Sequence, residues 1–222
     1  MPTMKHTRLI LASIIAFSVS ALSAGEPVKL SLDSFTDQKG GKVPAGWVEE
    51  ADGVIHRKEK AGDIISKKDF SDFIIEWDWK VAEGANSGLK YWVNNFSKNA
   101  DKPSWLGIEY QMIDDDRHPD AHRGDNHNTA CIYDIKATIT GKPVKPAGEW
   151  NTSKVISQGG KLQHFLNGKL VVESDTKSAE WPELIAKSKF KKVEGFAPGK
   201  GRFLLQDHGD EVWFKNIRVT TP

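Results

Sequence analysis

The chain has 222 residues, of which 27% are charged and 38% hydrophobic, so it is long enough for one globular domain with a sizeable core and short for two. Its formal net charge is +1, because 31 lysines and arginines balance 30 aspartates and glutamates. No basic stripe stands out, which argues against a nucleic-acid partner. The single cysteine, Cys131, excludes an intramolecular disulfide, and its apolar neighbours indicate a buried filler rather than a reactive thiol.

The N-terminus has the three parts of an export signal. Basic residues at positions 5, 6 and 8 precede an apolar run over 9–19, and small residues follow. The run is shorter than the roughly 20 residues that a membrane span needs. We therefore expect residues 1–24 to be a signal peptide, with cleavage after Ala21 or Ala24. The mature protein is then periplasmic or secreted, without stable membrane insertion.

Short segments of alternating apolar and polar residues, separated by turn residues, fill the rest of the chain. Asn167-Gly168 is the strongest short hairpin signal, and 182–189 is the one expected helix. This pattern predicts an all-β jelly-roll sandwich of two antiparallel sheets, in a single domain over 25–222. The expected strands are 28–34, 53–56, 63–66, 70–81, 89–94, 106–113, 130–135, 153–157, 161–166, 169–173, 201–206 and 211–220.

The strand expected at 106–113 has one apolar and one polar face. Side chains alternate along a strand, so the apolar residues at even positions point one way while Glu109 and Gln111 point the other. Asp114 falls out of this phase, as a bulge or the end of the strand would explain. A loop rich in Asp, His and Asn follows over 114–128. Carboxylates beside imidazoles suit acid–base chemistry, although a solvated outer face would show the same alternation.

Two further groups in the sequence allow more than one interpretation. His118, His122 and Asp114 offer ligands for a divalent metal, but their spacing matches no dedicated metal motif, and a hydrogen-bonding loop is the alternative. Trp92 and Trp105 are either platforms for stacking a sugar or part of the core.

Motifs of several large enzyme classes are absent from the sequence. It has no Gly-x-Ser-x-Gly elbow, Walker loop, dinucleotide fingerprint, His-Glu-x-x-His or cysteine pair for zinc. Carboxylates, histidines and amides on strands and loops are what remain for chemistry.

Four sequence pieces, taken in order, resemble one family. They are residues 86–91 (Asn-Ser-Gly-Leu-Lys-Tyr), 107–115 (Gly-Ile-Glu-Tyr-Gln-Met-Ile-Asp-Asp), 148–151 (Gly-Glu-Trp-Asn) with 167–168, and 205–209 (Leu-Gln-Asp-His-Gly) with 214–217. Their order and spacing resemble the 3-keto-disaccharide hydrolase family over about residues 45 to 220. The resemblance implies a concanavalin A-like jelly roll with a concave sugar-facing sheet, found in exported bacterial proteins associated with oxidised glycosides.

The resemblance also implies a reaction. A ketone at C3 of a sugar acidifies the proton on C2, so that a base can remove it, the enediolate expels the C1 oxygen, and water then re-adds. We expect Glu109 or a loop histidine as the base, Lys90 or a bound divalent metal as the electrophile, and His208 as the acid. The expected substrate-binding residues are Gln111, Asp114, Trp92, Trp105, Asn128, Tyr133 and Gln206.

The same fold hosts retaining glucanases, whose carboxylates follow the pattern Glu-x-Asp-x-x-Glu. Here the pattern is Glu109-x-Gln111-x-x-Asp114, with an amide at the centre and a shorter last acid. A double displacement needs two carboxyl groups about 5–5.5 Å apart, so the sequence disfavours it. A non-catalytic carbohydrate-binding module using the same face is the rival hypothesis.

Overall fold

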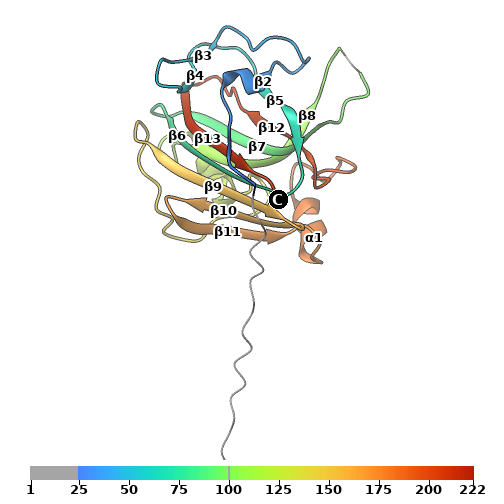
Figure 1. Ribbon diagram of the computed structural model, residues 1–222. Helices are drawn as coiled ribbons and strands as arrows, with labels where there is room; N and C mark the ends of the chain where they lie inside the picture. The colour runs from blue at the N-terminus through green and yellow to red at the C-terminus, as the bar shows by residue number, and fades with distance from the viewer. Residues whose placement is uncertain (1–24, 100) are drawn as a thin grey trace, which may run out of the picture.

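The computed structural model describes residues 25–99 and 101–222 (Figure 1). The signal peptide predicted for 1–24 lies outside these residues and stays a prediction. Within the described residues, no helix has the length and apolar character required to cross a membrane.

Two antiparallel sheets pack face to face (Figure 1). The larger sheet runs β11 (Lys169–Asp175), β10 (Lys161–Leu166), β9 (Asn151–Gln158), β6 (Phe73–Val81), β13 (Val212–Thr220), β4 (Ile55–Arg57) and β3 (Trp47–Glu49), with β1 (Val28–Lys29) also paired to β13. The smaller sheet runs β2 (Phe35–Thr36), β5 (Ile64–Phe70), β12 (Gly201–Leu205), β7 (Asn86–Asn95) and β8 (Trp105–Ile113). The expected two-sheet sandwich is confirmed.

The core lies between the sheets and is rich in aromatic side chains. Trp77 and Trp79 of β6 face Tyr110 of β8, and the rings of Trp77 and Tyr110 meet edge to face at 4.9 Å. Such pairs add to the free energy that burial of their area provides. The apolar face predicted for 106–113 is the core face, so the polar face of β8 points out of the sandwich.

Most expected elements form, with two differences in the chain's irregular parts. The hairpin at Asn167-Gly168 is confirmed, with positive φ at both residues, and the helix expected at 182–189 forms as α1, Glu180–Lys187. The expected strand at 28–34 is wrong beyond Lys29, because a 3-10 turn begins at Leu32. The expected strand at 130–135 is also wrong: φ is positive at both Ala130 and Asp134, so only isolated bridges form there.

A bulge in β7 changes the face on which Trp92 lies. The pairing of β7 with β8 shifts between Tyr91 and Asn94, and Trp92 has φ +51°. Its indole turns into the core, where it is 1% exposed and donates a hydrogen bond to the carbonyl of Ser71 at 2.9 Å. Of the two interpretations of Trp92, the core position is therefore confirmed and the sugar platform is wrong. A bulge adds one residue to a strand and so reverses the alternation beyond it.

A buried histidine of β10 ties the core to the loop that follows β8. His164 Nδ1 lies 2.9 Å from the carbonyl oxygen of Ala130. Because a carbonyl only accepts, Nδ1 carries the proton and Nε2 accepts from the hydroxyl of Tyr91 at 2.9 Å. Burial lowers the pKa of His164 from 6.5 to about 4. The ring is therefore a neutral link between the two sheets.

We predict that His164 lowers the free energy of unfolding as the pH is lowered from 6.5 to 4. In this window the unfolded chain takes up a proton on this ring and the folded chain does not, so acid favours unfolding. The shift corresponds to about 3 kcal/mol of unfolding free energy. Urea unfolding at several pH values would show a smaller loss over this window for His164→Gln than for the wild type. Equal losses would contradict the assignment.

Candidate active site

The outward face of the smaller sheet carries a row of polar side chains across three strands. Lys90 of β7 pairs in register with Glu109 of β8, and Gly88 pairs with Gln111. Gln206 follows directly after β12, and its backbone N–H donates to the carbonyl of Gly88 at 3.0 Å. The polar face expected from the sequence therefore extends onto the two neighbouring strands.

Glu109 is the centre of this row. Its residue is 4% exposed, and Oε2 lies 3.5 Å from Nζ of Lys90. The side-chain amide of Gln206 joins the two groups: oriented to satisfy both, its nitrogen donates to Glu109 Oε1 at 3.2 Å and its oxygen accepts from Lys90 Nζ at 3.1 Å. A buried charge is costly unless it is paired and hydrogen-bonded, and here both conditions are met.

Gly88 makes room for the carboxylate of Glu109. A Cβ at this position would lie 2.7 Å from Oε1 and 3.0 Å from Cγ of Glu109. A glycine within a strand commonly marks such a close approach. The Glu109 side chain therefore lies against the backbone of β7, beside Lys90.

A second carboxyl group, Asp63, lies at the start of β5. Its Oδ1 accepts from the backbone N–H of Asp207 at 2.9 Å, and its Oδ2 accepts from the amide of Gln38 at 3.1 Å. Burial raises the pKa of Asp63, and the positive charge of Lys90 opposes that rise. Lys90 thus interacts electrostatically with two carboxyl groups, those of Asp63 and Glu109.

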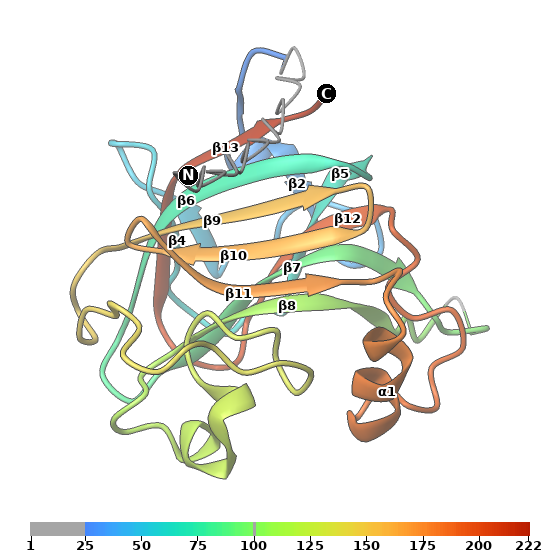
Figure 2. The same cartoon turned by 90° about the horizontal axis from the view of Figure 1, so that it is seen from below.

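The loop after β8 and the segment after α1 bring three more groups to this face. Figure 2 shows the yellow-green loop with its short helices and the orange helix α1 on the side of the sandwich near β8. Tyr133 donates its backbone N–H to the carbonyl of Glu109 at 3.1 Å and its hydroxyl to Asp120 at 2.7 Å. Lys189 places its ammonium 4.1 Å from the centre of the Tyr133 ring.

The ionisation of these two side chains is perturbed. Burial raises the pKa of Tyr133, and its hydrogen bond to Asp120 adds to that rise. Burial of one side of Lys189 against the protein lowers its pKa, while the negative charge of Glu109 acts in the opposite direction. Lys189 is nevertheless exposed as a residue, so solvent reaches part of its side chain.

Gln111 lies on the same face but is almost fully enclosed. It is 1% exposed, and its amide nitrogen makes a long hydrogen bond of 3.4 Å to the carbonyl of His127. Its amide oxygen has no partner among the described residues. Asn128, which follows His127, is half-buried at the end of a 3-10 helix, Asp125–His127.

The turn after β12 is clamped to the rest of the sheet by Asp207. Its carboxylate accepts from the backbone N–H groups of Ala61 and Gly62, both at 2.6 Å, and from Gly209 at 3.0 Å, and it pairs with Arg57 Nε at 2.7 Å. Burial alone would raise the pKa of Asp207, but the hydrogen bonds outweigh burial and hold the pKa below its usual value. This clamp fixes the turn that carries Gln206.

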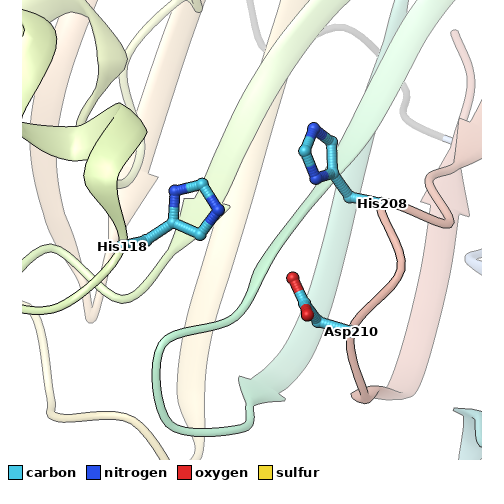
Figure 3. A group of neighbouring side chains, drawn as sticks. All are labelled: His118, His208 and Asp210. Carbon is cyan, nitrogen blue, oxygen red and sulfur yellow. The ribbon is translucent and has the colours of Figure 1, made fainter.

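The same turn brings two side chains to the loop after β8. His208 and Asp210 come within reach of His118, and one ligand atom from each of the three lies within 4.8 Å of the others (Figure 3). His118 precedes the 3-10 helix Pro119–Arg123, and the rings of His118 and His208 meet nearly perpendicular, with centroids 6.0 Å apart.

The predicted metal ligands are partly corrected by this arrangement. Of the predicted set, only His118 belongs to a ligand group among the described residues; its partners are His208 and Asp210. His122 is exposed on the 3-10 helix. Asp114 is 6% exposed and accepts from the backbone N–H groups of Gly84 at 2.8 Å and Asp116 at 3.1 Å. These contacts make Asp114 a turn-stabilising residue rather than a ligand.

Trp105 is on the outer face, at the far end of β8 from Gln111. It lies four residues before Glu109, which is about 13 Å along a strand. Its indole nitrogen donates to the carbonyl of Gln38 at 2.9 Å, and the guanidinium of Arg202 lies 5.5 Å from its ring. Trp105 is therefore half-buried and already engaged by its neighbours.

The sequence-based prediction missed Asp63, Lys189 and Asp210 as members of the site. Asp210 had a usable signal, because it shares a four-residue turn with His208. Asp63 and Lys189 had none: each is far from Glu109 in the chain, and only the fold brings them near it.

Solved structures place the sandwich among proteins that act on carbohydrates. A crystal structure of a candidate glycosyl hydrolase from Parabacteroides distasonis matches with a TM-score of 0.76 at 33% identity, covering 85% of this chain and 88% of that one. A second from the same organism matches with a TM-score of 0.58 at 26% identity, covering 78% and 88%. Together with the outward sheet face that carries Glu109, Lys90 and Gln206, these matches define a carbohydrate-active jelly roll.

The family follows from the sequence match. Residues 29–220 match the model of the 3-keto-alpha-glucoside-1,2-lyase-like domain, and the chain belongs to that family. A 3-keto-disaccharide hydrolase from Bacteroides thetaiotaomicron is 34% identical over 207 residues, covering 80% of this chain and 71% of the relative. The resemblance inferred from the four sequence pieces is confirmed, and the chain is a hydrolase-type enzyme acting on carbohydrates.

We predict that Gly88→Ala moves the carboxylate of Glu109 without unfolding the sheet. The added Cβ would lie 2.7 Å from Oε1, so the Glu109 side chain must shift away from residue 88. A crystal structure of the variant should show Oε1 of Glu109 displaced from its position beside the backbone of β7 and the Lys90–Glu109 distance changed from 3.5 Å.

The matched control is Gly41→Ala, where the three atoms nearest to the added Cβ all belong to the carboxylate of Asp37, at 2.8 Å and beyond. This variant should leave Lys90 and Glu109 in place. An unmoved Glu109 in Gly88→Ala would show that the close approach is not a constraint.

Proposed function

We propose that this protein cleaves the glycosidic bond of 3-keto-glycosides and 3-keto-disaccharides by elimination followed by hydration. The observation that carries this proposal is the buried Glu109 carboxylate, held between Lys90 and Gln206 on an outward sheet face. A carboxylate beside an ammonium can take a proton while the ammonium stabilises the negative charge that forms. The family membership and the name of the Bacteroides relative support this choice of substrate.

Glu109 removes the C2 proton of the sugar, and the electron pair of that C–H bond forms the enediolate with the C3 ketone. The C1–O bond then breaks, and the departing oxygen takes a proton. Water adds to C1, and a proton returns to C2, so the net change is hydrolysis. The departing alcohol and the 3-keto sugar are the products.

Lys90 is the electrophile for the C3 oxygen in this proposal. An ammonium has three N–H donors; Gln206 accepts from one, and a second lies on the side of the ion pair with Glu109. The substrate ketone would use the third. The burial of the pair strengthens this attraction, because charges interact more strongly away from water.

Lys189 is a better candidate than His208 for the acid that protonates the departing oxygen. The charge of Lys189 interacts with both Glu109 and Lys90, and its lowered pKa eases release of a proton. No hydrogen bond or ion pair in 25–99 and 101–222 joins either His208 or Lys189 to Glu109, Lys90 or Gln206; what distinguishes Lys189 is that its charge acts on Glu109 and Lys90.

The rival hypothesis of a carbohydrate-binding module loses support from the tryptophans. Trp92 is in the core, and Trp105 is engaged by Gln38 and Arg202. A binding module needs an open aromatic face for a sugar to stack on. A site built around a buried acid and two lysines fits catalysis better.

We also propose that the protein is exported, on the basis of the basic, apolar and small-residue segments of 1–24. Expression of the full chain in a bacterial host should yield a mature protein in the periplasm or medium. Its intact mass should correspond to a chain that begins after Ala21 or Ala24. Recovery of the full-length mass from the cytoplasm would contradict the proposal.

The decisive variant is Glu109→Gln, which keeps the shape of the side chain and removes the base. Loss of a general base should lower kcat for release of an aglycone from a chromogenic 3-keto-glucoside by at least about 10²-fold. Glu183→Gln, on the exposed face of α1, is the matched control and should leave the rate unchanged.

Wild-type turnover by Glu109→Gln would refute its role as the base. Saturable binding of the sugar with no release by the wild-type protein would instead favour the binding module.

A further inference from the structure

We propose that His118, His208 and Asp210 form a site for a divalent first-row transition ion, with Zn²⁺ as the ion that best suits the ligand set. One ligand atom from each residue lies within 4.8 Å of the other two (Figure 3). Two imidazoles and one carboxylate suit such ions, and three protein ligands leave a position open for water or substrate.

The distances require only a small closure. Ligand atoms bound to one tetrahedral zinc lie about 2.0–2.1 Å from the metal, and therefore roughly 3.3 Å from one another. His208 is exposed on a turn, so rotation of its side chain can close the gap without moving a strand. Figure 3 shows the three side chains converging from two segments that are distant in the chain.

Few contacts compete with a metal for the three side chains. None of them takes part in an ion pair among the described residues, although all three are ionisable. The one contact found for the Asp210 carboxylate is the backbone N–H of Asn86, which donates to Oδ2 at 3.0 Å. Oδ1 of Asp210 therefore remains available. The contact with Asn86 supplies the kind of outer support that ligating carboxylates have.

The backbone positions the ligands before any ion binds. The N–H of His118 donates to the carbonyl of Asp114 at 3.0 Å, and the Asp207 clamp holds the turn that carries His208 and Asp210. Asn86 lies at the start of β7, so Asp210 is fixed to the same sheet that carries Lys90. The ligand set is thus attached to rigid elements on two sides.

Metal binding changes which ring nitrogen of His118 carries the proton. Its Nδ1 accepts a hydrogen bond from the N–H of Asp120 at 3.1 Å, which places the proton of the neutral ring on Nε2. A ring that ligates through Nε2 carries its proton on Nδ1 instead, so this hydrogen bond must break. We therefore expect the first turn of the 3-10 helix at Pro119–Arg123 to rearrange when the ion binds.

The metal site and Gln206 share one turn, so metal binding should change the rate of turnover. This consequence rests on the proposed function. His208 is then a ligand rather than a free acid, which agrees with the assignment of Lys189 as the acid. The existence of the site does not depend on the reaction.

The test is a titration of the mature wild-type protein, freed of metal by a chelator, with Zn²⁺ in a calorimeter and with Co²⁺ by visible absorption. We expect one equivalent to bind, with Co²⁺ giving the absorption of an imidazole–carboxylate site. His208→Ala and Asp210→Asn should each weaken binding more than about 10-fold. His122→Ala is the matched control, an exposed histidine outside the group, and should bind as the wild type does.

Wild-type affinity in His208→Ala and Asp210→Asn, or an equal loss in His122→Ala, would overturn the site. Thermal melting without metal shows that each variant is folded. Metal binding as expected without cleavage of a 3-keto-glucoside would refute the proposed function alone. Cleavage with no metal binding would refute this inference alone.

Discussion

The buried pairing of Glu109 with Lys90 is the interaction on which the site depends. A carboxylate that is 4% exposed is tolerable only because an ammonium at 3.5 Å and the amide of Gln206 satisfy it. This requirement explains the neighbouring sequence: Gly88 leaves space for the carboxylate, and Asp207 holds the turn that supplies Gln206. The sheet provides a rigid base, because β7 and β8 are paired along most of their length.

Much of the fold, and the outward positions of Glu109 and Gln111, could be predicted from alternation alone, whereas Lys90, Gln206 and His208 entered through the resemblance to a family. The period of two along β8 assigns Tyr110 to the core and Glu109 to the outer face, and the structure agrees. The same rule fails at Trp92, because a bulge reverses the faces and no residue of the sequence announces it. Positive φ at Ala130 likewise breaks a segment whose composition favours a strand.

The rest of the site depends on contacts between distant parts of the chain. Lys189 comes to Glu109 only through the segment after α1, and Asp63 only through the start of β5. The sequence does suggest imidazole–carboxylate chemistry around His118, but the partners expected from the sequence are its neighbours in the loop, His122 and Asp114. The fold instead joins it to His208 and Asp210, which are about ninety residues away in the chain. Local spacing carries no information about such a grouping.

In the proposed reaction the bond from carbon 2 to hydrogen breaks during cleavage, with Glu109 as the base. The most direct measurement compares aglycone release from a 3-keto-glucoside with that from the same compound deuterated at C2. Elimination predicts a primary isotope effect on kcat/KM, because the C2 proton leaves before or with the C1 oxygen. Equal rates for the two substrates, together with full activity of Glu109→Gln, would contradict the account and point to direct displacement at C1.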